Sequence, residues 1–151
     1  MIQRALPSVF LTAILLVACE STTEPTFEVI ETSMFDASLG ITLADFTKLA
    51  SGVYIRDDSV GTGTVFAAGD SVSLDHTAWL RNGALLGSGP FAIDTDRLIP
   101  GSRNGLDGMA EGGTRMLIVP PSLRYGSNPP FGSPIPVGAI LVFEVELIDI
   151  F

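Results

Sequence analysis

The clearest pattern along the chain is an alternation of apolar and polar residues in two separate stretches. In residues 71–76, two apolar side chains and His76 fall on one face, and two serines and Asp75 fall on the other. In residues 139–151, four alternate residues beginning at Leu141 are apolar, and the two glutamates between them share the opposite face. A period of two residues is typical of strands with one buried face. Both stretches predict strands, and the glutamates predict solvated positions rather than an acid–base pair.

Shorter apolar runs predict further strands. Residues 53–55 form one such run. The run from Arg115 to Val119 lies between a glycine pair, which favours a turn, and a proline pair, which ends a strand because proline has no N–H to donate. We expect Arg115 to be solvated and Trp79, which extends the strand beyond His76, to be an ordinary packing residue. Residues 84–91 are apolar but broken by two glycines and a proline.

Helical signals are weak. In residues 102–109, Leu106 and Met109 are spaced i, i+3, which predicts a short helix. Its two glycines each cost about 1 kcal/mol relative to alanine. Residues 27–51 are ambiguous: Phe46 with Leu49 fits a helical face that Gly52 could cap, and an extended conformation of residues 40–43 is equally compatible.

The first 18 residues predict a targeting segment. Arg4 precedes an apolar run that is too short to span a bilayer as a helix, and the run ends in Leu-Val-Ala-Cys, which is similar to a bacterial lipobox. We expect residues 1–18 to be a lipoprotein signal peptide and Cys19, the only cysteine, to carry the lipid. The alternative is a plain secretory signal with a chance cysteine. Residues 19–26 predict a polar, flexible tether.

Composition narrows the possible functions. The chain has 151 residues, of which 46% are hydrophobic and 17% charged, which favours a folded domain over disorder. A formal charge of −9 disfavours nucleic-acid binding, because phosphates must be neutralised by Lys and Arg. One cysteine excludes an internal disulfide, and one histidine makes a histidine-based metal site improbable.

Two motifs in the second half of the chain carry a family resemblance. In Glu111–Gly126, a glycine turn, a strand and a proline stop are followed by Leu-Arg-Tyr-Gly. Ile135-Pro136 and the strand beginning at Leu141 follow at the C-terminus. This order of motifs resembles the FKBP-type peptidyl-prolyl isomerases over roughly residues 52–151. Residues 27–51 would then be a variable N-terminal lead-in.

The resemblance implies a fold and an activity. The fold would be α+β, with a curved antiparallel sheet of about five or six strands wrapped around one short α-helix. The activity would be rotation of X–Pro amides, whose barrier is roughly 18–20 kcal/mol, in an apolar cleft without any cofactor or metal. The partners would be proline-containing polypeptide clients and, through the N-terminal lipid, a membrane of the bacterial cell envelope. The protein would face the periplasm or exterior and act as a monomer.

The same resemblance assigns roles to particular residues. The Tyr125 hydroxyl would donate a hydrogen bond to a bound carbonyl, and the backbone N–H of Ile99 would donate to the ligand. The substrate-binding residues would be His76, Leu86, Phe91, Leu98, Ser102, Ile135 and Phe143. From the residues alone, Tyr125 could instead pin its own loop, and His76 could be a core histidine bonded to a backbone carbonyl.

Several positions depart from the family pattern. His76 stands where a tyrosine is usual, and Ser102 where a tryptophan floors the pocket. Leu86 and Gly87 replace a phenylalanine and an aspartate. Since an aromatic side chain buries on the order of 150–250 Å², these replacements remove apolar contact area. They leave open a second function, a catalytically weak or inactive FKBP-like binding module or chaperone.

A third function, hydrolysis by a serine nucleophile, is weakly indicated. Gly69-Asp70-Ser71 superficially resembles a nucleophile motif, and His76 could serve as the base. Ser71 and His76 lie on opposite faces of the same predicted strand, however. A nucleophile and its base must come within hydrogen-bond distance, which this placement prevents.

Overall fold

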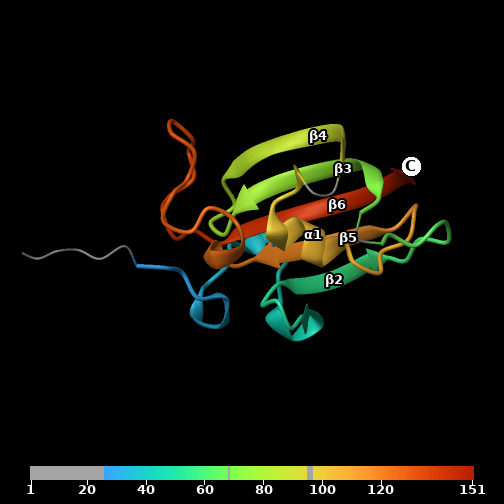
Figure 1. The fold of residues 1–151 in the computed structure, drawn as a ribbon. Coiled ribbons are helices and arrows are strands. Elements are labelled where there is room, and N and C mark those ends of the chain that lie inside the picture. The colour runs from blue at the N-terminus through green and yellow to red at the C-terminus, as the bar shows by residue number, and fades with distance from the viewer. Residues whose placement is uncertain (1–25, 68, 95–96) are drawn as a thin grey trace, which may run out of the picture.

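A single antiparallel sheet of six strands organises the molecule. The computed structural model describes residues 26–67, 69–94 and 97–151; the predicted signal peptide, Cys19 and nearly all of the tether lie outside this part. The strand order is β1-β2-β5-β6-β3-β4. Figure 1 shows the sheet curving past a single short α-helix. The elements are β1 Thr47–Lys48, β2 Tyr54–Ser59, β3 Ser71–Leu80, β4 Leu85–Asp94, α1 Pro100–Leu106, β5 Thr114–Val119 and β6 Leu141–Ile150.

The predicted fold class is confirmed, and so are the predicted strands around residues 53–55, 71–80, 115–119 and 139–151. The broken apolar segment after residue 84 forms the continuous strand β4. β4 lies at the edge of the sheet, where it pairs only with β3. A proline is tolerated at such an edge because one side of the strand has no ladder hydrogen bonds to lose. Among the described residues, no helix is long and apolar enough to cross a membrane.

The lead-in, residues 27–51, contains three 3₁₀ turns, Ile30–Thr32, Ala37–Leu39 and Leu43–Asp45, and ends in β1. The helical alternative around Phe46 is wrong, because β1 begins directly after it and pairs with β2. Gly52 is not a helix cap. It lies at φ 91° in the turn between β1 and β2, where its N–H donates to the Leu49 carbonyl at 2.9 Å.

Each face of the sheet carries an apolar cluster, and the face away from α1 is only partly covered. The helix face, covered by α1, carries Val72, Leu74, Leu117, Val119, Leu141, Phe143, Val145 and Leu147. The opposite face packs against the lead-in and carries Tyr54, Trp79, Met116, Ile118 and Val142 together with Ile30, Leu39 and Phe46. Trp79 is therefore a packing residue on the face away from α1, as expected. The glutamates of β6 are exposed on that opposite face.

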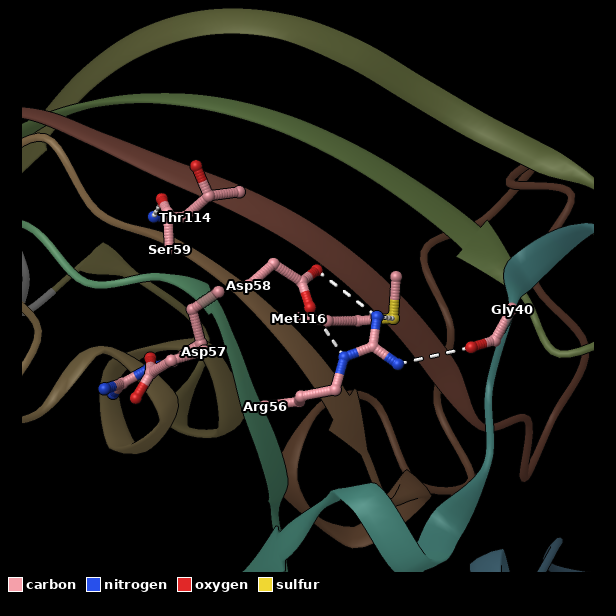
Figure 2. A network of polar contacts seen from close by, with 8 residues as sticks. Gly40, Arg56, Asp57, Asp58, Ser59, Thr114 and Met116 are labelled. Atoms are coloured by element: carbon pink, nitrogen blue, oxygen red, sulfur yellow. Dashed lines mark hydrogen bonds and ion pairs between the residues drawn. The ribbon is translucent and has the colours of Figure 1, made fainter.

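Arg56 ties the lead-in to the sheet (Figure 2). Its Nη1 donates to the Gly40 carbonyl at 3.2 Å, and its Nε donates to Asp58 at 2.6 Å. The guanidinium also lies 4.9 Å from the centre of the Phe46 ring. These contacts position the lead-in on the opposite face of the sheet and leave the helix face to α1.

The glycines of α1 allow the helix to approach β5 closely. Gly101 and Gly105 are both buried. A Cβ on Gly105 would come within 2.7 Å of a Leu117 methyl carbon, and a Cβ on Gly101 would overlap with a methyl group of Val119. The same glycines that lower the helix propensity of this segment therefore set the distance between α1 and the sheet.

Candidate functional site

A cavity of about 200 Å³ lies on the helix face, where α1 meets β3 and β6. Strands β3 and β6 supply one wall, α1 and the residues before it supply another, and Arg124, next to the 3₁₀ turn Pro121–Leu123, supplies a third. The lining residues are Leu74, His76, Arg97, Leu98, Ile99, Ser102, Leu106, Arg124, Phe143 and Val145.

Five of the predicted site residues line this cavity. His76 and Phe143 do so because they are in phase with the apolar residues of β3 and β6. Leu98 and Ile99 precede Pro100, which disfavours helical backbone for the residue before it. Ile99 accordingly has φ −59° and ψ 143° and forms the N-cap of α1. Ser102 follows in the first turn of the helix.

The other predicted residues lie outside the cavity lining. Leu86 and Ile135 pack against the same apolar cluster as the cavity walls without lining the cavity itself. Tyr125 is half-buried and reaches the cavity only through its neighbour Arg124. Phe91 pairs with Leu74 through its backbone, and its side chain lies outside the described part of the structure.

His76 is bonded to a backbone carbonyl and also lines the cavity. Its Nδ1 lies 2.8 Å from the Gly89 carbonyl oxygen on the neighbouring strand β4. Because a carbonyl only accepts hydrogen bonds, Nδ1 must carry the proton. This bond fixes the ring on β3 while the imidazole lines the cavity. Ser71, the serine considered with it, does not line this cavity, which leaves the hydrolase hypothesis without geometric support.

Arg124 is a site residue that the sequence reasoning missed. Its guanidinium lies 4.4 Å from the centre of the Tyr125 ring and 5.6 Å from that of Phe143. Its Nη2 donates to the Tyr125 hydroxyl at 3.3 Å. Its Nε and Nη1 are buried and have no hydrogen-bond partner. Arg124 stands directly before Tyr125, at a position where the family motif accepts any residue. Its position next to the tyrosine was therefore the only indication of a role in the sequence.

The described lining of the cavity is positively charged. Besides Arg124 it includes the exposed Arg97, and no Asp or Glu is among the residues that line it. Within the described residues, no group of three or more His, Cys, Asp or Glu side chains is placed to hold a metal ion. The arrangement is suited to gripping an apolar ring and donating hydrogen bonds to oxygen atoms.

The prediction that Arg115 is solvated is wrong. Its side chain is buried at the other end of α1, 5% exposed. Its Nη1 donates to the carbonyls of Gly105 and Asp107 at 2.8 and 3.0 Å, and its Nε donates to Asp57 at 2.5 Å. The error has a simple cause: Arg115 alternates in phase with Leu117 and Val119, so the strand directs it toward the helix.

Comparison with known sequences identifies a family. The profile of the FKBP-type peptidyl-prolyl cis-trans isomerases matches residues 63–148. The chain is 33% identical over 107 residues to the FK506-binding protein of Neisseria meningitidis serogroup B, an alignment that covers 66% of this chain and 97% of that protein. It is 38% identical over 109 residues to FK506-binding protein 4 of Chaetomium thermophilum, covering 68% of this chain. The aligned segment spans only about a fifth (22%) of that fungal relative.

Solved structures share the fold. FkpA from Escherichia coli superposes with a TM-score of 0.64 at 29% identity, over 70% of this chain and 51% of that one. A peptidyl-prolyl cis-trans isomerase from Pseudomonas syringae superposes with a TM-score of 0.66 at 28% identity, over 70% of this chain and 80% of that one.

Proposed function

The chain belongs to the FKBP-type peptidyl-prolyl cis-trans isomerase family, and we propose that it accelerates cis–trans rotation of X–Pro bonds in protein clients. The observation that carries this proposal is the cavity between α1 and the sheet. Its wall is formed by Leu74, Phe143 and Val145, and its rim by the helix cap residue Ile99. Such a pocket fits a proline ring and excludes the water that stabilises the planar ground state of the amide.

The proposed mechanism needs no proton transfer to a catalytic base and no covalent intermediate. Rotation weakens the conjugation of the amide, so catalysis requires groups that bind the twisted amide better than the planar one. In this proposal the apolar wall holds the ring, the Ile99 N–H donates to a client carbonyl, and the Tyr125 hydroxyl donates to a second one. The Tyr125 hydroxyl accepts a hydrogen bond from Arg124, so its own proton remains available to donate to the client.

We further propose that the protein is a bacterial lipoprotein attached through Cys19. The sequence supports this: an apolar segment ends in Leu-Val-Ala-Cys, and a polar tether separates it from the folded part. The domain would then act as a monomer on clients in the periplasm or exterior. Mass spectrometry of the chain expressed in bacteria should show a lipid mass on Cys19 and loss of residues 1–18. An unmodified Cys19, or cleavage elsewhere, would refute the anchor.

The activity is tested by NMR exchange spectroscopy on a proline peptide. We expect the full chain, kept in solution with a mild detergent, to accelerate exchange between the cis and trans forms. Tyr125→Phe should slow the catalysed exchange about fivefold, the loss of one hydrogen bond of about 1 kcal/mol. No acceleration by folded protein with any residue before the proline would refute catalysis.

One group of residues favours the alternative of a binding module. Ser102 gives the cavity a small polar floor, and Leu86 packs behind the lining rather than within it. Both reduce aromatic contact with a proline ring. Suppressed aggregation of an unfolded client, in the absence of accelerated exchange, would establish this alternative.

A further inference from the structure

Arg124 carries hydrogen-bond donors that the folded chain does not use. Its Nε has one N–H and its Nη1 has two, and both nitrogens are buried without a partner. The large majority of buried polar side-chain atoms in folded proteins are hydrogen-bonded, and an unpaired charged donor is costly. Since Arg124 also lines the cavity, a turn of its guanidinium can bring these donors to a ligand.

The guanidinium also lies against aromatic rings beside the cavity. It stacks against the rings of Tyr125 and Phe143, and its Nη2 bonds to the Tyr125 hydroxyl. The side chain that carries the unused donors is therefore packed against Phe143, which lines the cavity, and against Tyr125, which lies beside the lining.

The described cavity lining is positively charged, whereas the chain as a whole is negatively charged. The sequence has 17 acidic and 8 basic residues. Even so, two arginines and no carboxylate are among the described residues of the lining. A single arginine could have been neutralised by a neighbouring acid, as Arg115 is by Asp57 on the same face. The lining therefore suits an acidic ligand group.

We propose that Arg124 is a specificity-determining residue that binds the carboxylate of an acidic client residue adjacent to the proline. This inference rests on the proposed function, since it takes the cavity as the proline site. Arginine pairs with carboxylates through charge-assisted hydrogen bonds, which are roughly twice as strong as neutral ones. Clients with Asp or Glu next to proline are preferred over clients with the isosteric amides.

The test compares matched peptides and matched variants. Peptides with Glu or Gln directly before the proline, and a second pair with Glu or Gln directly after it, are titrated into the ¹⁵N-labelled full chain in mild detergent. We expect one Glu peptide to bind about tenfold more tightly than its Gln partner, the effect of one charge-assisted hydrogen bond. The preference should shrink at high salt.

Two variants separate the arginine from the overall charge. Arg124→Met keeps an unbranched side chain of similar length and should bring the Glu and Gln affinities together. Lys48→Met removes the same charge from the opposite face, where Lys48 lies over the Tyr54 ring, and should keep the preference. Unchanged dispersion of the amide spectrum shows that each variant is folded. Should Arg124→Met unfold, Arg124→Lys, which keeps the charge but loses the planar fork, should reduce the preference instead.

The outcomes are distinguishable from those of the proposed function. Equal affinities for Glu and Gln peptides in the wild-type chain, or no shifts around the cavity with any peptide, overturn the carboxylate inference whatever the exchange rates are. A preference for Glu that disappears in Arg124→Met supports it, even where exchange is not accelerated. In that last case the isomerase proposal fails and the binding site stands.

Discussion

The two ends of α1 each meet a largely buried arginine, and the two arginines differ in what they bond. At the C-terminal end, Arg115 donates to the carbonyls of Gly105 and Asp107 and to the carboxylate of Asp57. At the N-terminal end, Arg124 lines a cavity and leaves Nε and Nη1 without partners. Arg115 thus completes hydrogen bonds of the folded chain, whereas Arg124 keeps donors that the folded chain does not use.

The comparison distinguishes an arginine that stabilises the fold from an arginine that is available for ligand binding. The last carbonyls of a helix lack partners within the helix, and a cation placed there satisfies them. Arg115 does this, so its removal should affect the whole fold. Among the described residues the Arg124 side chain donates to no backbone carbonyl, so its removal should affect ligand recognition more than unfolding. The predictions below separate these two effects.

The largest effect is expected for Arg115→Met. The substitution leaves the carbonyls of Gly105 and Asp107 buried without their donor, and we expect the free energy of unfolding to fall by about 3 kcal/mol. Urea denaturation followed by circular dichroism measures this. Asp57→Asn is the matched control, since Asp57 is 38% exposed and keeps water as a partner. It should cost less than about 1 kcal/mol. A loss for Asp57→Asn equal to that for Arg115→Met would mean that the ion pair, not the helix end, matters.

A smaller effect is expected when α1 is pushed away from the sheet. In Gly101→Ala the added methyl group overlaps with Val119, and overpacking of this kind costs about 1–3 kcal/mol. Because Gly101 lies between Ile99 and Ser102 at the cavity, peptide affinity should also decrease. Gly87→Ala in β4 is the control, since no atom lies within 4 Å of its added Cβ. Calorimetry and the same peptide titration measure both quantities. A stable Gly101→Ala with unchanged affinity would show that α1 moves freely over β5.

The smallest effect is expected on the opposite face, away from both arginines. Hydrogen bonds from Lys48 and then Tyr54 lower the pKa of Glu31 to about 2. A carboxyl group whose pKa is depressed by folding stabilises the fold above its unfolded pKa, here 4.5, and loses that contribution as the pH falls toward about 2.

Glu31→Gln should therefore lower the free energy of unfolding near neutral pH by a small amount, because the group is exposed to solvent. The difference from the wild type should shrink as the pH falls and vanish only below about pH 2. Urea denaturation at several pH values measures this. Peptide affinity should not change, and a change would mean that the opposite face is coupled to the cavity.

The sequence predicts the sheet and half of the cavity for the same reason. Alternation assigns His76 to the face of Leu74, and Phe143 to the face of Val145, and both strands deliver these side chains to one pocket. His76 and Phe143 are placed by a rule that acts over a few positions. Ile99 is assigned through the family resemblance, and its place before Pro100 agrees with the extended backbone that it adopts.

The remaining features depend on contacts between distant segments. Phe46 fits a helix or a strand, and pairing of β1 with β2 decides between them. Arg115 and Arg124 both appear as charges near the edges of apolar segments. Only the position of α1 determines that one reaches the helix carbonyls and the other does not. The alternation of β5 did place Arg115 inward, but its charge argued for solvent. Hydrogen-bond partners 8 to 58 residues away reverse that argument.

The proline in β4 has a consequence for how copies of the protein meet. β4 is an outer strand of the sheet, and a ten-residue outer strand offers a template on which another chain can align. Pro90 supplies no amide proton at the middle of that strand, and Gly89 beside it has φ 134°, outside the range of a regular strand. A second chain aligning there would meet a gap in its ladder. Pro90, which interrupts the apolar pattern of the sequence, thus also disfavours fibre-like association of the protein at high concentration.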